Sequence, residues 1–153
     1  MLFRSGETIQ LDILVENMGR VNYGPELYDY KGITKSVCLG LQELHHWEIY
    51  PLELKDLSLL QYSSYIATNL PAFYYGELEI EECHDTFIYL DHFKKGNVYI
   101  NGFNLGRYYE KGPQKSLYVP APLLHQGINE IIIFEIHQCE EPTIEFKDIS
   151  DLG

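Results

Sequence analysis

Carboxylates are the side chains of this 153-residue sequence whose types and spacing come nearest to supporting chemistry. They form two dense runs, residues 77–82 and residues 140–141. Two carboxylates held close together can act as general acid and general base. In the first run, however, glutamates alternate with the apolar residues Leu78 and Ile80, which is the pattern of a β-strand with one solvated face. We therefore expect these carboxylates to face water, and the sequence predicts no catalytic residue.

Histidine and cysteine spacing predicts neither a metal site nor a disulfide framework. None of the six histidines pairs with another ligand at a zinc-like spacing, and the mixed run 81–85 is typical of an exposed turn. The three cysteines, Cys38, Cys83 and Cys139, are odd in number and widely spaced, which favours a reducing compartment. We expect a cytoplasmic protein without a cofactor, and only Ca²⁺ held through backbone carbonyls stays open.

Length and charge exclude several classes of protein. The chain is too short for a (β/α)₈ barrel, which needs about 250 residues. A formal net charge of −12 without a basic patch would repel polyanions, so we expect neither nucleic acid nor a membrane as a partner. The longest apolar run, Ile131–Phe134, is far shorter than the ~20 residues of a membrane span. The first residues show no charged leader with an apolar stretch, so no secretion signal is expected.

The elements that must position any site are predicted to be strands. Thirteen of the 21 aromatic residues are tyrosines, which favour β-structure. Asn101-Gly102 predicts a type I′ hairpin turn, and Ile131–Phe134 predicts a central strand buried on both faces. Leucine spacing over 52–60 fits a short helix as well as a loop. About nine strands imply an all-β antiparallel sandwich or jelly roll. The expected strands are 7–17, 36–41, 47–52, 74–81, 86–90, 96–101, 117–119, 128–136 and 143–146.

Six stretches of the chain carry recognisable motifs: Leu11–Gly24, Lys31–Ile33, Trp47–Leu52, Pro71–Tyr74, Lys95–Val119 and Gly127–Glu130. In type and order these motifs resemble those of the family 35 glycoside hydrolases, the retaining β-galactosidases. Tyr109 departs from this pattern, because the family commonly has tryptophan there.

The resemblance implies a part of such an enzyme, because every matched motif belongs to its non-catalytic β-domains and not to its catalytic barrel. Residues 1–35 resemble the end of the preceding β-domain, and residues 36–153 resemble a whole jelly-roll domain of the galactose-binding type. The first 35 residues would then dock on the main sandwich or fray. The parent enzyme would hydrolyse terminal β-galactosides with retention, which requires two carboxylates about 5–5.5 Å apart that this chain lacks.

Within the jelly roll, Tyr99, Asn104, Arg107 and Tyr108 are the candidate carbohydrate ligands. Side chains just past a hairpin turn project beyond the sheet, and a tyrosine ring can stack on the apolar side of a sugar. The alternative is structural: the turn, a tight bend at Gly106, and an arginine that pairs with a neighbouring domain. The same two interpretations apply to the single tryptophan, Trp47, which we expect in the core because Ile49 shares its face.

Arg20, Asn22 and Tyr23 lie in a loop of the part nearest the catalytic domain in the family, so they are candidate interdomain contacts. The main hypothesis is a non-catalytic region that braces the catalytic barrel and the first β-domain. One alternative is an autonomous module that binds galactosides weakly. Another is an acidic sandwich for contacts between proteins. Bracing predicts an exposed apolar patch, whereas a binding module predicts an aromatic-lined cleft.

Overall fold

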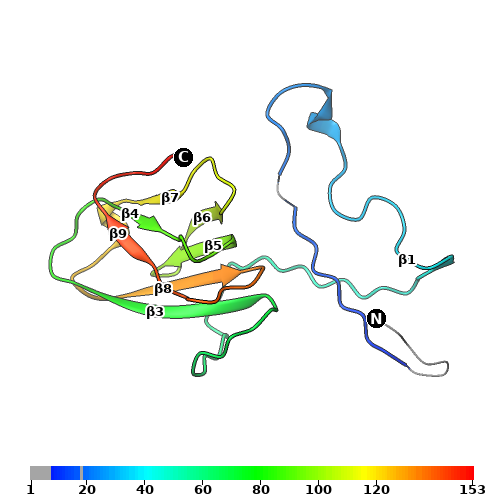
Figure 1. Cartoon of the computed structure of the whole chain (residues 1–153), viewed down its shortest axis with the longest axis horizontal. Coiled ribbons are helices and arrows are strands. Elements are labelled where there is room, and N and C mark those ends of the chain that lie inside the picture. The colour runs from blue at the N-terminus through cyan, green and yellow to red at the C-terminus, as the bar shows by residue number, and fades with distance from the viewer. Residues whose placement is uncertain (1–7, 18) are drawn as a thin grey trace. The chain divides into compact units, whose positions relative to one another are not determined.

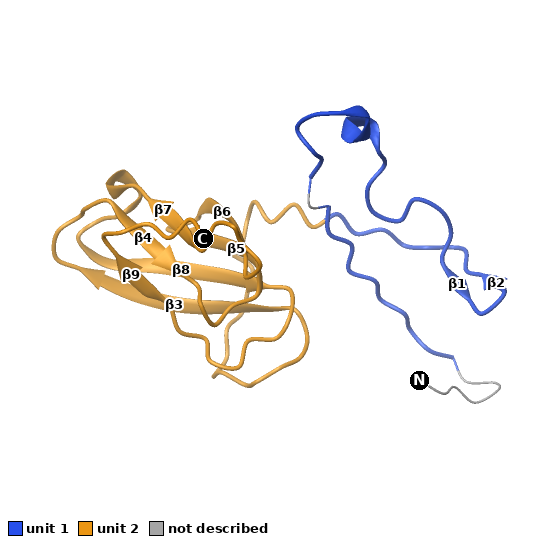
Figure 2. Cartoon of the chain, turned by 45° about the horizontal axis from the view of Figure 1, so that its top comes forward, with its two compact units in different colours: residues 1–51 blue, residues 52–153 orange. Residues whose placement is uncertain are grey.

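The computed structural model describes residues 8–17 and 19–153. The chain divides into two compact units, Met1–Pro51 and Leu52–Gly153 (Figure 2), and each is described here by itself. The domain boundary predicted after Lys35 stays a prediction, since compact units need not coincide with the domains of a family. Over the described residues, no helix is both long and apolar enough to cross a bilayer.

The first unit contains little regular structure. A 3₁₀ turn, η1 (Pro25–Tyr28), follows Gly24, whose φ of 101° is accessible mainly to glycine. Two short strands, β1 (Cys38–Leu39) and β2 (Gln42–Glu43), form an antiparallel hairpin. No described residue of this unit is buried.

Several predictions for this part of the chain were wrong. The stretch predicted as a strand over 7–17 is in no ladder in its described part, 8–17, and its apolar side chains are about half exposed. Strand-like alternation stabilises a strand only when a partner sheet covers the apolar face. Trp47, expected in the core, is 41% exposed, and its indole N–H donates to the Leu44 carbonyl (3.0 Å). The stretch 47–52 likewise forms no strand, and only Cys38–Leu39 does so within 36–41.

The second unit is an antiparallel sandwich of two sheets (Figure 1). One sheet has four strands in the order β3-β8-β5-β6, and the other has three in the order β7-β4-β9. This architecture confirms the predicted all-β antiparallel fold. The strands are β3 (Ala72–Ile80), β4 (Thr86–Tyr89), β5 (Lys95–Ile100), β6 (Phe103–Tyr109), β7 (Ser116–Val119), β8 (Gly127–Glu135) and β9 (Glu145–Lys147), with a 3₁₀ turn, η2 (Ala121–Leu123), before β8.

The core lies between the two sheets and contains Ile131 and Ile133 from β8. The alternate residues of the same strand, Ile132 and Phe134, are also buried, and the Phe134 ring stacks on Phe73 with centroids 4.6 Å apart. Strand β8 is therefore covered on both faces and flanked by β3 and β5, as predicted for a central strand. The other buried core residues are Ile88, Leu90, Phe93, Val98, Ile100, Tyr108, Leu117, Val119 and Cys139.

The structure adds one strand that was not predicted and decides one alternative that the sequence left open. Strand β6 was not predicted, because its polar and glycine-containing sequence lacks a clean alternation and a register shift opposite Val98 and Tyr99 disturbs its pairing. The segment 52–60, which sequence left open between helix and loop, contains no helix. Leu52 and Leu59 are exposed there.

The turn between β5 and β6 is the two-residue hairpin that the sequence predicted. Asn101 and Gly102 have φ of 49° and 78°, and Ile100 pairs with Phe103 across the turn. Positive φ at both central residues defines the type I′ turn, whose twist matches that of the strands it joins.

Replacing Asn101-Gly102 by Ala-Ala is expected to destabilise the fold by about 2–3 kcal/mol, because two residues with a Cβ are then held at positive φ. Thermal unfolding of the full chain measures this loss. Gly76→Ala serves as the control, since Gly76 is exposed, its φ is ordinary, and an added Cβ meets no atom within 4 Å. Equal thermal midpoints for both variants would contradict the prediction.

Candidate functional site

The four candidate carbohydrate ligands lie on the neighbouring strands β5 and β6, but they do not form one surface. Asn104 and Arg107 are exposed, whereas Tyr99 is 2% exposed and Tyr108 is 6% exposed. Tyr108 belongs to the core between the sheets, and Tyr99 does not. Packing covers both tyrosine rings, so neither presents a ring face at the surface of this structure. Carbohydrate binding by the four candidate residues stays a prediction.

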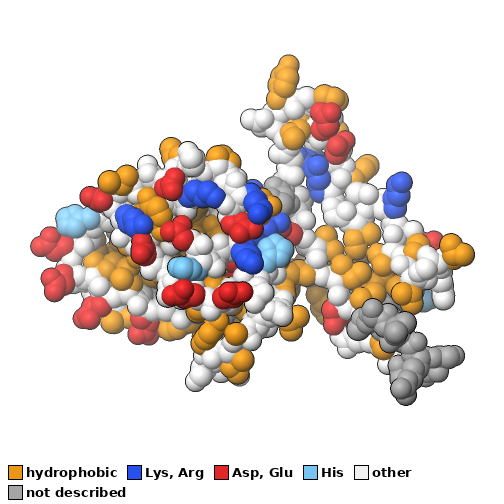
Figure 3. Space-filling model, viewed as in Figure 1, with side chains coloured by type: hydrophobic (Ala, Val, Ile, Leu, Met, Phe, Trp, Pro, Cys, Tyr) orange, Lys and Arg blue, Asp and Glu red, His pale blue; other side chains and the backbone are white. Residues whose placement is uncertain are grey.

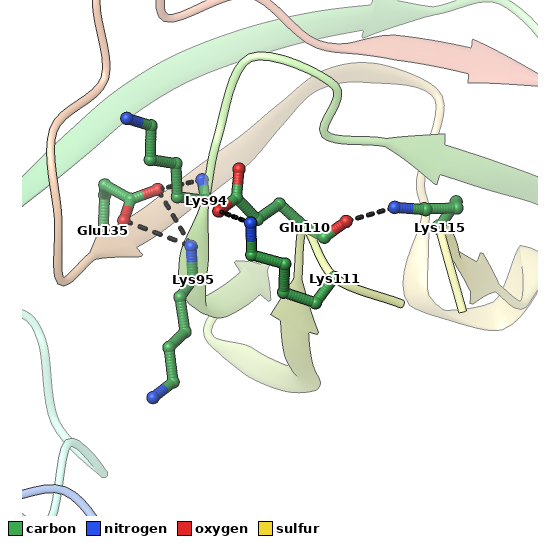
Figure 4. A network of polar contacts seen from close by, with 6 residues as sticks. All are labelled: Lys94, Lys95, Glu110, Lys111, Lys115 and Glu135. Atoms are coloured by element: carbon green, nitrogen blue, oxygen red, sulfur yellow. Dashed lines mark hydrogen bonds and ion pairs between the residues drawn. The ribbon is translucent and has the colours of Figure 1, made fainter. Parts of the chain in front are cut away.

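Tyr108 instead takes part in a buried polar cluster around Glu135 at the end of β8. The Glu135 carboxylate is fully buried and accepts hydrogen bonds from the backbone N–H groups of Lys94 (2.6 Å), Lys95 (3.2 Å) and His137 (2.8 Å). The Tyr108 hydroxyl donates a fourth (3.0 Å). In Figure 4 the side chains of Lys94 and Lys95 extend away from the carboxylate, so their backbone alone makes this contact. Such a carboxylate fastens strands and leaves little accepting capacity for a ligand.

Tyr108 and Gly96, next to Glu135, are also adapted to the packing of β5 against β8. Burial, followed by the charge of Glu135, raises the pKa of the Tyr108 hydroxyl far above its usual value, so the hydroxyl stays a donor. Gly96 lies opposite Tyr108, and a Cβ there would come 1.7 Å from the Phe134 carbonyl oxygen. The close approach of β5 to β8 thus requires glycine at this position.

A second buried cluster holds the hairpin turn. Asn129 is fully buried; its Oδ1 accepts from the Asn101 Nδ2 (2.8 Å) and from the His125 N–H (2.9 Å). Asn101 also donates to the Leu123 carbonyl (2.8 Å) and accepts from the Glu130 N–H (2.9 Å). The hydrogen-bonding groups of the Asn101 side chain therefore all have partners within the second unit.

The connections β4–β5 and β6–β7 enclose a small cleft of about 70 Å³ between Asp91, Phe93, Tyr109 and Gln114. A ligand pocket usually holds about 300–1,000 Å³. Two of its polar side chains already have partners: Gln114 donates to the Ser116 carbonyl (2.8 Å), and the Lys115 amine donates to the Glu110 carbonyl, as Figure 4 shows. This loop-end cleft can hold water, but it is too small for a sugar.

A larger cleft of about 550 Å³ lies in the same unit, between the segment 55–62 and strands β3 and β8. We call it the lateral cleft. Its walls carry the rings of Tyr62 and Tyr75, whose centroids are 4.9 Å apart at an interplanar angle of 41°. Burial and the nearby charge of Glu130 raise the pKa of Tyr62. The other lining residues are Lys55, Asp56, Leu57, Ser58, Leu60, Gly102, Glu130 and Ile132.

Sequence reasoning missed Tyr62, Tyr75 and Glu130 as site residues. Tyr62 and Glu130 are 68 positions apart in the sequence (130 − 62) and meet only because the segment before β3 folds back over the sheet. The only local signal was the strand alternation that places Tyr75 and Glu77 on one face, and it carries no information about a cleft.

Arg20, Asn22 and Tyr23 are all exposed in the first unit, with Tyr23 among its most exposed rings. Their role as interdomain contacts stays a prediction. Over residues 8–17 and 19–153, no three His, Cys, Asp or Glu side chains are grouped so that they could hold a metal ion.

The antiparallel sandwich of a four-stranded and a three-stranded sheet places the second unit in the class of all-β jelly-roll modules. Comparison with protein families agrees with this class. Residues 2–53 match the model described as "Beta-galactosidase, first all-beta domain", and residues 71–129 match "Beta-galactosidase, galactose-binding domain".

Similar curated proteins carry the same name. The chain is 44% identical over 151 residues to "Beta-galactosidase-1-like protein 2" of Homo sapiens, covering 94% of this chain and 24% of that protein. It is 43% identical over 135 residues to "Beta-galactosidase 1" of Dictyostelium discoideum, and the match covers 82% of this chain and 20% of that protein. It is 37% identical over 168 residues to "Beta-galactosidase" of Bos taurus, and this match covers 90% of this chain and 26% of that protein. The chain thus spans about a quarter of the length of these relatives.

The chain belongs to the β-galactosidase family and consists of its non-catalytic all-β and galactose-binding domains. The resemblance read from the sequence motifs is confirmed.

Glu135→Gln is expected to destabilise the chain by about 2–4 kcal/mol, because an amide NH₂ would then face buried N–H donors and one acceptor would be lost. Chemical denaturation measures the free energy of unfolding. Glu79→Gln, an exposed change of the same kind on β3, should leave it within about 0.5 kcal/mol. If the two variants were equally stable, the Glu135 carboxylate would not hold β5 to β8.

Proposed function

We propose that this chain serves as a structural β-region of a β-galactosidase, in which it braces the catalytic barrel and the rest of the first β-domain, the domain that residues 2–53 match. The enzyme as a whole would hydrolyse terminal β-galactosides with retention. The proposal is supported by the matches to non-catalytic domains and by the fraction of the relatives' length that the chain spans.

The observation that carries the proposal is the apolar surface of the first unit. Its described residues include no buried side chain, yet many large apolar ones are exposed (Figure 3). Exposed apolar surface of this extent is typical of an interaction site, because monomeric proteins seldom leave it uncovered. The exposed residues are Ile9, Leu11, Ile13, Leu14, Val15, Val21, Ile33, Leu39, Leu41, Trp47 and Ile49. We infer that the other domains of the enzyme cover this surface.

A second candidate function is galactoside binding by the second unit. The match of residues 71–129 to the galactose-binding domain favours it, and so does the presence of one cleft large enough for a sugar. Bracing and binding use different units of the chain, so they do not exclude each other.

The bracing role can be tested by replacing the matched region of bovine β-galactosidase with this chain. Leu11→Lys and Ile13→Lys should leave the isolated chain about as stable as before, since both side chains are half exposed there. In the chimaeric enzyme the same changes should lower the thermal midpoint and the rate of galactoside hydrolysis, because a buried ammonium is costly. Gln10→Lys is the control.

Bracing would be contradicted if the chimaera kept its midpoint and its activity with both apolar positions changed to lysine. A loss of the same size with Gln10→Lys would also count against it, because the effect would then come from added charge and not from lost packing.

The isolated chain should not hydrolyse a chromogenic β-galactoside, because its matches are confined to non-catalytic domains. The assay compares the purified chain with buffer. The double variant Glu77→Gln, Glu130→Gln removes the carboxylates that face each other across β3 and β8. Turnover that this double variant abolished would prove the chain catalytic and would refute the prediction.

A further inference from the structure

The lateral cleft combines two properties that a binding site for a small neutral molecule needs, a suitable volume and a mixed lining. Its volume of about 550 Å³ lies within the usual range for ligand pockets, about 300–1,000 Å³. It is lined by both apolar and polar side chains, and all of them belong to the second unit. The loop-end cleft, at about 70 Å³, is too small for a sugar, and its Gln114 and Lys115 side chains already have partners.

The tyrosine pair supplies the apolar wall. Tyr62 is 40% exposed and Tyr75 is 43% exposed, so each ring keeps part of its surface open. The Tyr75 hydroxyl donates to a Glu77 carboxylate oxygen (2.7 Å), which fixes its polar end. An open aromatic surface of this kind packs against the C–H groups of a sugar ring.

Glu130 supplies the acceptor. Its backbone is held by the hairpin turn, since Asn101 donates its N–H to the Glu130 carbonyl (2.9 Å) and accepts from the Glu130 N–H (2.9 Å). Among the described residues, none donates a hydrogen bond to the Glu130 carboxylate. A half-buried carboxylate on a fixed backbone can therefore accept from ligand hydroxyls, and such charge-assisted bonds are the stronger kind.

Charge decides the class of ligand. Asp56 and Glu130 line the cleft, and Glu77 lies directly opposite Glu130 across the two strands. Lys55 is the one basic residue in the lining, and its amine is paired with Glu53 (2.8 Å). Anions are therefore repelled, while a neutral molecule with many hydroxyl groups meets acceptors and an aromatic wall.

We propose that the lateral cleft is a binding site for a neutral sugar ring, of which a galactoside is the member to test. Tyr62 and Tyr75 form the stacking wall, and Glu130 accepts from the sugar hydroxyls. This inference deepens the second candidate function and does not depend on the bracing role.

The test is an NMR titration of the full chain with methyl β-galactoside. Saturating shifts are expected at Tyr62, Tyr75, Gly102 and Ile132, with a dissociation constant of about 1 mM, since one stacking wall and a few hydrogen bonds give only weak affinity. Galacturonate, which adds a carboxylate to the same ring, should bind at least about fivefold more weakly because of charge repulsion. Shifts confined to other residues, or none at tens of millimolar sugar, would overturn the proposal.

Matched variants test the assigned roles. Glu130→Gln and Tyr62→Leu should each weaken binding by about tenfold, through the loss of a charged acceptor or of the ring. Glu79→Gln and Tyr118→Leu are the controls: the first removes an exposed carboxylate outside the cleft, and the second an exposed ring on the other sheet. Thermal midpoints verify that each variant is folded.

Unchanged affinity in both cleft variants, or equal losses in the controls, would refute the site. These results are separate from those for bracing, because binding is measured on the isolated chain and bracing on the chimaeric enzyme. A negative titration would thus leave the chimaera result unaffected.

Discussion

The sandwich depends on one buried charge. Glu135 has no exposed surface. Burying a carboxylate costs much free energy unless protein hydrogen-bond donors replace the water molecules that hydrate it. Three backbone N–H groups and the Tyr108 hydroxyl replace this water, and those backbone groups flank the start of β5 and the end of β8. The charge therefore fixes where two neighbouring strands begin and end, and it requires glycine at position 96 to let them approach. A ring that could have stacked on a sugar is committed to this contact instead.

This commitment explains why the sequence alone does not show which candidate side chains are accessible to a ligand. The type of a residue shows that Tyr108 can stack on a ligand, but only the fold shows that its hydroxyl is needed by a carboxylate 27 positions away. The Asn101-Gly102 turn and the doubly buried strand around Ile131–Phe134 were predictable, because both follow from local backbone preferences or from composition. The cleft was not, since Tyr62 and Glu130 come together only through the fold.

The two units differ in how many of their apolar side chains are buried within the unit. In the second unit, the alternation along β3 places Leu78 against the core and leaves Glu77 and Glu79 exposed. In the first unit, the period-two alternation over 8–17 ends in exposed apolar side chains and no ladder. The alternation in the sequence is equally clear in both, so the pattern correctly marks an apolar face. It does not show whether the covering surface lies within the chain, which is why strand prediction succeeded in one unit and failed in the other.

Structural and binding roles meet at the hairpin turn. The Asn101 side chain donates to buried Asn129 and accepts from the backbone N–H of Glu130, and the Asn101 N–H donates to the Glu130 carbonyl. The hydrogen bonds that stabilise the turn therefore also fix the backbone of Glu130, the acceptor of the lateral cleft. A preorganised acceptor loses less entropy on binding than one on a mobile loop. The Tyr62 wall, by contrast, comes from a segment without regular structure. The cleft thus has one side fixed by hydrogen bonds and one side that meets β3 through the Tyr62–Tyr75 ring contact, and the affinity for a sugar should depend most on that contact.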